Sequence, residues 1–214
     1  MKNMIIFDLD GTLWDTADAT FKIVNDYLKE NGYSFNVSKD VIVENMGYEF
    51  DVCAEHYFPK LEKKKALELL DKIYEWEAQL LKDGLVIGKV FDNVKDTIEK
   101  LSKKYILCIV SNCSNDFYIE SFIETANVSK YITDYVAASN FFISKAEAIR
   151  KIKNRYQAKK VIYVGDTLKD QVSAVDAGGT FVYAKYGFGD DLVSKYSITD
   201  ISQLTSLASY IFEE

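Results

Sequence analysis

Histidine, proline and cysteine are scarce in this 214-residue chain, which contains one, one and three of them respectively. The single histidine, His56, excludes a histidine-rich metal site and a relay of several histidines. The cysteines, Cys53, Cys108 and Cys113, are odd in number and lack metal-ligand spacing. We therefore expect reduced thiols in a cytoplasmic protein rather than a disulfide framework.

The chain also has little positive charge and no long apolar run. Its 26 basic and 33 acidic residues give a formal net charge of −7, which argues against binding to a nucleic acid polymer or an anionic membrane. No apolar run approaches the ~20 residues that span a bilayer. The first apolar stretch leads directly into acidic residues, so we expect no signal peptide. A small phosphorylated substrate stays compatible with this charge, because a bound metal can reverse its sign locally.

Apolar stretches of strand length alternate with helical periodicity over most of the chain. We expect strands at residues 4–7, 105–110, 135–138, 161–164 and 180–184, and helices at 94–101, 116–125, 146–156, 169–177 and 202–212. This alternation predicts an α/β fold with a doubly wound, parallel, Rossmann-like sheet and right-handed crossovers.

The part of the chain between the first two expected strands shows no strand pattern. Its helical periodicity covers residues 16–32, 38–46 and 61–81. We therefore expect an inserted all-helical domain with its own small core at residues 16–85. Residues 1–15 and 86–214 would then form the α/β core domain.

Polar residues follow three of the expected strands at the point where each strand ends. These are the stretches 8–12, 111–112 and 165–170, which include Asp8, Asp10, Ser111, Asp166 and Asp170. Because the carboxyl ends of parallel strands meet at one edge of a sheet, where ligands bind, we expect the three stretches to form one site. Carboxylate oxygens are hard ligands that suit Mg²⁺, and a serine hydroxyl and backbone amides can donate to phosphate.

Each of these features also has a plainer interpretation. Aspartate and glycine are common in turns, so residues 8–12 alone are compatible with a solvated turn. Ser111 is compatible with a turn or a helix cap. Lys145, at the start of an expected helix, is either a solvated lysine or a positive charge for the site, and Lys151 and Lys159 are further candidates for that charge. The convergence of several polar stretches on one sheet edge favours the site.

These residues resemble the haloacid dehalogenase-like hydrolases, in their phosphatase branch. Residues 8–13 (Asp-Leu-Asp-Gly-Thr-Leu) resemble the first motif of that family, Ser111 the second and Lys145 the third. Residues 165–170 resemble the fourth. The third motif departs from the family pattern, because Ala146 stands where a proline usually follows the lysine. The helical stretch after the first motif is similar to the alpha-helical cap of the phosphoglycolate phosphatase-like members.

The resemblance implies a Mg²⁺-dependent phosphatase that acts on a small phosphorylated metabolite. Asp8 would attack the phosphorus and become an aspartyl-phosphate. Asp10 would protonate the leaving alkoxide and then take a proton from the water that cleaves the intermediate. A halide leaves without a proton, so the second acid argues against dehalogenation.

The resemblance also implies which residues bind the metal and the phosphate. Mg²⁺ would be held by the carboxylate of Asp8, the backbone carbonyl of Asp10 and the carboxylate of Asp166. Asp170 would be a further metal ligand or would contact one. The expected phosphate-binding residues are Thr12, Ser111, Asn112 and Lys145.

Other functions remain compatible with the same residues. A phosphosugar mutase uses the same core and chemistry. A phospho-accepting signalling domain is also an acidic α/β fold with Mg²⁺, but it is normally shorter and lacks a helical insertion. A binding protein without turnover is the remaining alternative. The substrate stays open among phosphoglycolate, nucleoside monophosphates, sugar phosphates and pyrophosphate, because the fold does not supply specificity; we expect a monomer.

Overall fold

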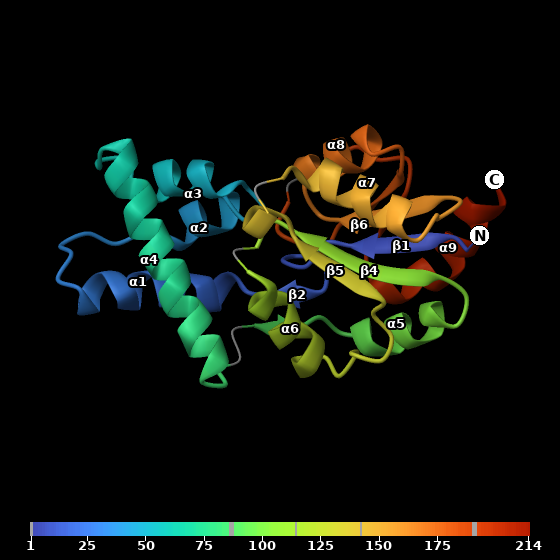
Figure 1. Ribbon diagram of the computed structural model, residues 1–214, viewed down its shortest axis with the longest axis horizontal. Coiled ribbons are helices and arrows are strands. Elements are labelled where there is room, and N and C mark those ends of the chain that lie inside the picture. The colour runs from blue at the N-terminus through green and yellow to red at the C-terminus, as the bar shows by residue number, and fades with distance from the viewer. Residues whose placement is uncertain (1, 86–87, 114, 142, 190–191) are drawn as a thin grey trace.

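The computed structural model describes residues 2–85, 88–113, 115–141, 143–189 and 192–214. Within them, a six-stranded sheet has the order β5-β4-β1-β6-β7-β8, and every neighbouring pair is parallel (Figure 1). Its strands are β1 (Met4–Phe7), β4 (Ile106–Ser111), β5 (Asp134–Ala137), β6 (Val161–Gly165), β7 (Thr180–Ala184) and β8 (Ser197–Ile198). Five of them begin and end within one residue of their predicted positions. β8 was not predicted, because two residues carry no periodic pattern.

Strand β1 lies between β4 and β6, and its side chains alternate between two separate cores. Ile5 and Phe7 belong to one core, and Met4 and Ile6 belong to the other. All four are fully buried, which explains the unbroken apolar run. The first core includes α5 (Val94–Ser102), α6 (Asp116–Thr125) and α9 (Leu204–Glu213), and the second includes α7 (Lys145–Arg155) and α8 (Leu168–Asp176). Helices on both faces confirm the predicted doubly wound fold.

Four of the described helices lie beyond one end of the sheet (Figure 1). They are α1 (Ala17–Glu30), α2 (Lys39–Glu44), α3 (Phe50–Tyr57) and α4 (Lys63–Lys82), and we call them the helical segment. Helix α4 packs against both α1 and α3. The sequence did not predict α3, because its eight residues bury only Cys53, Ala54 and Tyr57, which is too short a pattern to recognise.

Two short strands join the helical segment to the sheet. β2 (Trp14–Asp15) and β3 (Lys89–Val90) pair antiparallel where the chain enters and leaves that segment. The predicted boundary between residues 85 and 86 borders residues 86–87, which lie outside the described residues. Two 3₁₀ helices, η1 (Ala138–Phe141) and η2 (Ile201–Gln203), complete the elements described. None of the helices in the described ranges is long and apolar enough to span a membrane.

Candidate active site

Three neighbouring strands bring the predicted site residues to one edge of the sheet. Asp8 directly follows β1, Ser111 is the last residue of β4, and Asp166 directly follows β6. The amide of Asp8 donates to the carbonyl of Val164 at 2.8 Å, which continues the pairing of β1 with β6 up to the site. The parallel register therefore joins residues that are more than 150 positions apart in the sequence.

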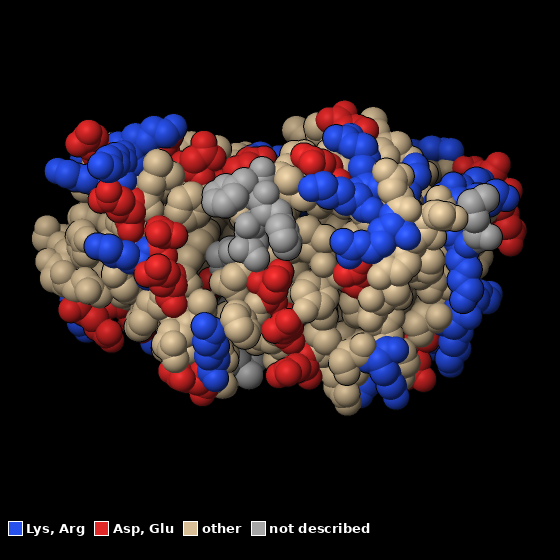
Figure 2. All heavy atoms as spheres, viewed as in Figure 1, with Lys and Arg blue, Asp and Glu red and all other residues tan. Residues whose placement is uncertain are grey.

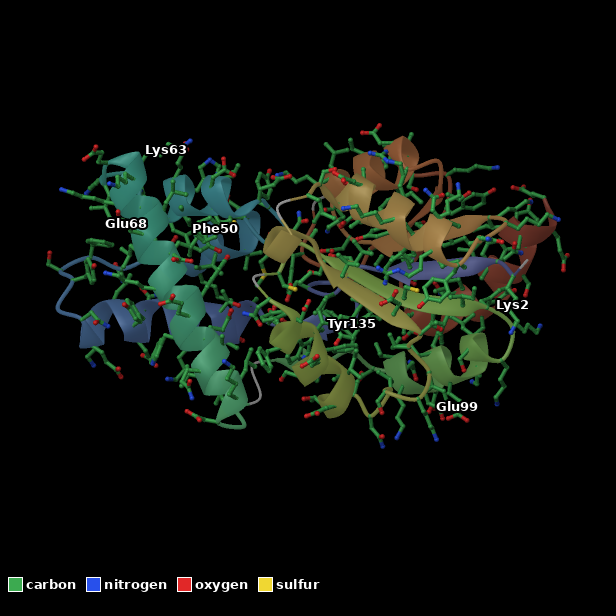
Figure 3. All side chains as sticks on the ribbon, in the orientation of Figure 1. Lys2, Phe50, Lys63, Glu68, Glu99 and Tyr135 are labelled. Carbon is green, nitrogen blue, oxygen red and sulfur yellow. The ribbon has the colours of Figure 1, made fainter. Side chains whose placement is uncertain are left out.

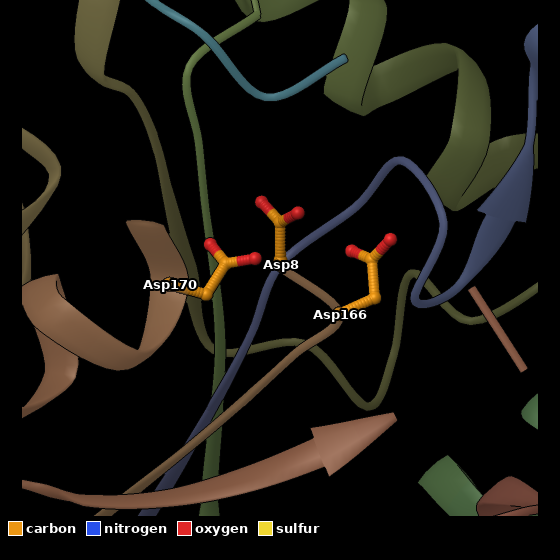
Figure 4. Close-up of side chains that lie close together, drawn as sticks. All are labelled: Asp8, Asp166 and Asp170. Atoms are coloured by element: carbon orange, nitrogen blue, oxygen red, sulfur yellow. The ribbon is translucent and has the colours of Figure 1, made fainter. Parts of the chain in front are cut away.

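The carboxylates of Asp8, Asp166 and Asp170 converge at this edge (Figure 4). One oxygen of each lies within 4.8 Å of the others, and all three side chains are buried. Burial, followed by the charge of Asp170, raises the pKa of Asp8 well above its usual range and that of Asp166 to about 7. Three buried acids at such distances need compensating positive charge, and their hard oxygens fit a divalent cation.

Lys145 supplies part of that positive charge. Its Nζ donates to Oδ1 of Asp8 at 3.0 Å and to Oδ1 of Asp170 at 2.6 Å, and its side chain is only 3% exposed. Burial lowers the pKa of Lys145, but the carboxylates of Asp170 and Asp8 outweigh this and hold it above its usual value. The lysine is therefore protonated. The hydroxyl of Ser144 caps α7, so the helix starts at Lys145 with Ala146 in the position of the usual proline.

The two alternative lysines lie elsewhere. Lys151 is exposed and pairs with Glu147 on the same helix, and Lys159 is exposed in the loop before β6. Only Lys145 of these three candidates contacts the acid cluster.

Asp166 is held by two backbone amides that follow β7 and by the side chain of Thr12. Its Oδ2 accepts from the amides of Phe188 at 2.7 Å and Gly189 at 3.3 Å, and its Oδ1 accepts from the hydroxyl of Thr12 at 3.3 Å. Gly11 has a φ of +75°, and a Cβ there would lie 2.2 Å from Oδ2 of Asp166. Glycine at position 11 thus allows both the turn after β1 and the close approach of Asp166.

The two carboxylate oxygens of Asp170 have different partners: Oδ2 contacts Thr167 at the start of α8, and Oδ1 contacts Lys145. Its Oδ2 accepts from the amide and the hydroxyl of Thr167, at 3.0 and 2.7 Å. The Thr167 hydroxyl in turn accepts from the amide of Asp170, which forms a capping box at the start of α8. The helix start therefore fixes the orientation of Asp170 toward the site.

The carboxylate of Asp10 has partners other than the acid cluster. Its Oδ1 accepts from the hydroxyls of Thr16 at 2.6 Å and Tyr118 at 2.7 Å. Burial raises the pKa of Asp10, and these two hydrogen bonds partly oppose the increase. Asp10 is not one of the three carboxylates that converge, so its expected metal contact rests on its backbone carbonyl alone.

Ser111 and Asn112 lie side by side in the sequence but point to different neighbours. Ser111 is buried, and its hydroxyl accepts from the amide of Cys113 at 3.2 Å. The side-chain amide of Asn112 donates to the carbonyl of Gly47 at 3.0 Å. Gly47 follows α2, so Asn112 connects the sheet edge to the helical segment rather than to the acid cluster.

A cavity of about 60 Å³ lies between the sheet edge and the helical segment. Asp10, Ser111 and Tyr118 line it from the α/β part, and Asn45, Tyr57 and Glu77 are among the residues that line it from the helical segment. The partially closed space adjoins a carboxylate that can transfer a proton. A small group bound there would lie between Asp10 and the helices.

Several site residues were not found by sequence reasoning. Thr16 and Tyr118 contact Asp10, and the fully buried Tyr163 places its hydroxyl 3.4–3.5 Å from Asp8 and Asp170. Residues 188 and 189 contact Asp166 through backbone amides, which no side-chain pattern reveals. For each of them the contact depends on tertiary packing, so no spacing in the sequence signals it.

The chain is similar to known proteins over most of its length. Residues 5–184 match the model of a family described as haloacid dehalogenase-like hydrolase. The phosphoglycolate phosphatase of Vibrio parahaemolyticus is 24% identical over 200 residues, which cover 86% of this chain and 84% of that protein.

Two solved structures show the same fold. A predicted phosphatase from Clostridium acetobutylicum has a TM-score of 0.80 at 20% identity and covers 100% of both chains. A predicted phosphoglycolate phosphatase from Haemophilus somnus has a TM-score of 0.79 at 19% identity and covers 97% of this chain and 98% of that one. As its motifs predicted, the chain belongs to the haloacid dehalogenase-like hydrolases, and it is similar to their phosphatase branch.

Proposed function

We propose that the protein is a Mg²⁺-dependent phosphatase that hydrolyses a small phosphate monoester through an aspartyl-phosphate on Asp8. One observation carries the proposal. The buried carboxylate of Asp8 accepts a hydrogen bond from Lys145 and lies within 4.8 Å of oxygens of Asp166 and Asp170. A nucleophile, a fixed positive charge and a set of hard oxygen ligands thus meet at one sheet edge.

The two half-reactions divide between Asp8 and Asp10. An oxygen of Asp8 forms a bond to phosphorus while the bond from phosphorus to the alcohol oxygen breaks, and Asp10 gives that oxygen its proton. Water then attacks the phosphorus of the acyl phosphate and gives its proton to Asp10. The products are inorganic phosphate and the regenerated Asp8. Thr16 and Tyr118 hold the carboxylate of Asp10 for both transfers.

Asp8, Asp166, Asp170 and the carbonyl of Asp10 would hold the metal. When bound, Mg²⁺ supplies positive charge that reduces repulsion between the acids and the phosphate dianion. Lys145 and Ser111 contribute positive charge and a hydroxyl donor for the phosphoryl oxygens. Thr12 donates to Asp166, and Asn112 donates to the helical segment. We therefore propose that Thr12 and Asn112 position these groups as well as help to bind the phosphate.

In this proposal residues 16–85 act as a cap over the core of residues 1–15 and 86–214. Contacts across the interface support this role, including Asn112 with Gly47 and an ion pair between Lys169 and Glu49. A closed cap excludes water while the aspartyl-phosphate forms. The three cysteines are free, which fits the cytoplasmic compartment that we propose, and we take the active unit to be a monomer.

A first experiment measures hydrolysis of 4-nitrophenyl phosphate by the purified chain. Activity should be present with Mg²⁺, absent with a chelator and restored poorly by Ca²⁺, whose looser coordination disturbs alignment of the nucleophile. Full activity in the chelator would contradict the proposed site. A panel of phosphorylated metabolites, including phosphoglycolate as indicated by the names of the relatives, then tests the substrate. Release of an isomerised sugar phosphate instead of free phosphate would identify a mutase.

A further inference from the structure

Glu77, on α4, is a buried acid without a partner among the residues that the structure describes. Its side chain is 5% exposed, and it lines the cavity between the helical segment and the sheet edge together with Asp10. Within the described ranges, no hydrogen bond or ion pair reaches its carboxyl group. A buried carboxylate in this situation is costly unless something else supplies a donor or a positive charge.

The lining of the cavity offers Glu77 no positive charge. Among the described residues that line the cavity there is no lysine, arginine or histidine. The nearby hydroxyl of Tyr118 already donates to Asp10. Burial, followed by the charge of Asp10, raises the pKa of Glu77 to about 8. The cavity therefore has two acids and no compensating cation of its own.

The space next to this cavity is acidic as well. A larger cavity of about 890 Å³ shares Tyr74 with the first one and lies between the helical segment and the α/β part. Four acids and one lysine are among the residues that line it: Glu49, Asp51, Asp71, Glu75 and Lys82. Figure 2 shows acidic side chains on this face over α4 and over α6, on both sides of the interface. A ligand that enters from this side meets mainly negative charge.

We propose that the cavity binds the alcohol half of a small phosphate monoester that carries a protonated amine, and that Glu77 pairs with this amine. The inference rests on the proposed phosphatase function and specifies its substrate class. With the phosphate at Asp8 and the ester oxygen at Asp10, the alcohol half enters the space that Glu77 lines. A bound ammonium favours the ionised form of Glu77, whose pKa burial otherwise raises to about 8, and the two charges then pair. A carboxylate there, as in phosphoglycolate, would lie beside two acids without a cation and is disfavoured. A volume of about 60 Å³ restricts the group to a few non-hydrogen atoms.

The test compares three small phosphate esters that share the O–CH₂–C unit: O-phosphoethanolamine, ethyl phosphate and 2-phosphoglycolate. They present an ammonium, a methyl group and a carboxylate to the cavity. We expect kcat/KM to fall in that order, by about 10-fold or more from the first ester to the last, since a charge-assisted hydrogen bond to Glu77 is available to the ammonium alone. Glu77→Gln should lower the ratio of kcat/KM for phosphoethanolamine over ethyl phosphate by about 10-fold.

Glu68→Gln is the matched control. Glu68 lies on the same helix and is exposed, so this variant removes one negative charge without changing the cavity (Figure 3). Its ratio for the two esters should equal that of the wild type. Faster hydrolysis of phosphoglycolate than of ethyl phosphate by the wild type would overturn the inference, and so would an unchanged ratio in Glu77→Gln. If Glu77→Gln does not fold, the order of kcat/KM for the three esters in the wild type tests the inference by itself.

The same assay separates this inference from the function on which it rests. Hydrolysis of 4-nitrophenyl phosphate without any preference for the amine would refute the inference and leave the phosphatase proposal intact. No hydrolysis of any ester in the presence of Mg²⁺ would refute both.

Discussion

The acids at the sheet edge and the acid on α4 are all buried, but their surroundings differ. Asp8 and Asp170 contact Lys145, and Asp166 accepts backbone hydrogen bonds from residues 188 and 189. No group in the described part of the chain contacts Glu77 in this way. The α/β core thus provides partners for its own buried acids, whereas the helical segment presents a buried acid that has none among the described residues.

This difference indicates how the two regions divide their tasks. In the function that we propose, the sheet edge holds the groups that every phosphate ester needs, and strand ends and helix starts fix them in place. In the same proposal, the helical segment meets the part of the ester that varies between substrates. Substitutions at the edge should therefore reduce activity toward all esters, and substitutions in the cavity should change the preference among them.

Replacement of Asp8 should have the largest effect. Asp8→Asn removes the attacking oxygen charge, so hydrolysis of every ester should fall by ~10⁴-fold or more. The assay is release of 4-nitrophenol in Mg²⁺. Asp96→Asn, on the exposed side of α5, is the control and should keep full activity. Residual turnover by Asp8→Asn above a few per cent of the wild-type rate would exclude Asp8 as the nucleophile.

Replacement of Lys145 should have the next largest effect. Lys145→Met leaves Asp8 and Asp170 without their shared cation and removes one positive charge from the phosphoryl site. We expect kcat/KM to fall by about 100- to 1,000-fold for all three esters, with their ranking preserved. Lys151→Met, on the exposed face of the same helix, should change activity little. Equal losses in the two variants would contradict the role of Lys145.

Glu77 should make the stability of the fold depend on pH. Its pKa in the folded state is about 8, above the ordinary value of 4.5, so the folded chain keeps a proton there that the unfolded chain has lost. Stability from this group is complete below pH ~4.5 and is lost as the pH rises toward 8. Glu77→Gln should match the wild type in free energy of unfolding near pH 4.5 and exceed it by on the order of 4 kcal/mol at pH 9.

Urea unfolding at a series of pH values measures that difference, and the ligand-free protein is used. Glu68→Gln serves again as the control, because the carboxylate of Glu68 is exposed. A constant difference between Glu77→Gln and the wild type across this pH range would show that Glu77 is compensated in the folded state. The contrast between the two regions would then disappear.

Loss of the hydroxyl of Tyr118 should have the smallest effect. Tyr118→Phe removes one of two hydrogen bonds to Asp10, and Thr16 retains the other. We expect kcat to fall by about 10-fold, with a smaller loss for aryl esters, whose leaving group needs no proton. Tyr135→Phe removes a similar hydrogen bond to Glu120, away from the site, and should keep full activity (Figure 3). An equal loss for aryl and alkyl esters would argue against a role through Asp10.

The α/β core could be predicted from sequence because its signals are local. The run at residues 4–7 is apolar at every position since both faces of β1 are covered, and Asp8 and Asp10 follow it directly. Because parallel strands end at the same edge of a sheet, the sequence also predicts that Asp8 lies near Ser111 and Asp166. Lys145 could also be predicted as a source of positive charge for the site, although Lys151 and Lys159 offered the same ammonium group. Burial separates the three, and burial depends on how α7 packs.

The cavity could not be predicted, because its residues share no pattern. Glu77 falls at helical spacing with the apolar residues of its expected helix, but this spacing does not show what lies opposite it, and the packing of α4 against the other helices places it in the cavity. Helix α3 and the two-residue strands are too short for a periodic signal. Tyr118 reaches Asp10 across 108 positions. Contacts of this kind depend on the packing of elements that are distant in the sequence, so no single stretch of sequence predicts them.

The central claim is that Asp8 becomes phosphorylated and that Asp10 acts in both half-reactions. Asp10→Asn keeps Asp8 and the backbone carbonyl at position 10, but it lacks the base that activates water. With 4-nitrophenyl phosphate, whose phenolate leaves without a proton, the first step should proceed and the intermediate should accumulate. Rapid acid quench followed by peptide mass mapping should find a phosphoryl group on Asp8 in Asp10→Asn and none in Asp8→Asn. A phosphorylated residue other than Asp8, or no covalent species in Asp10→Asn, would contradict the account.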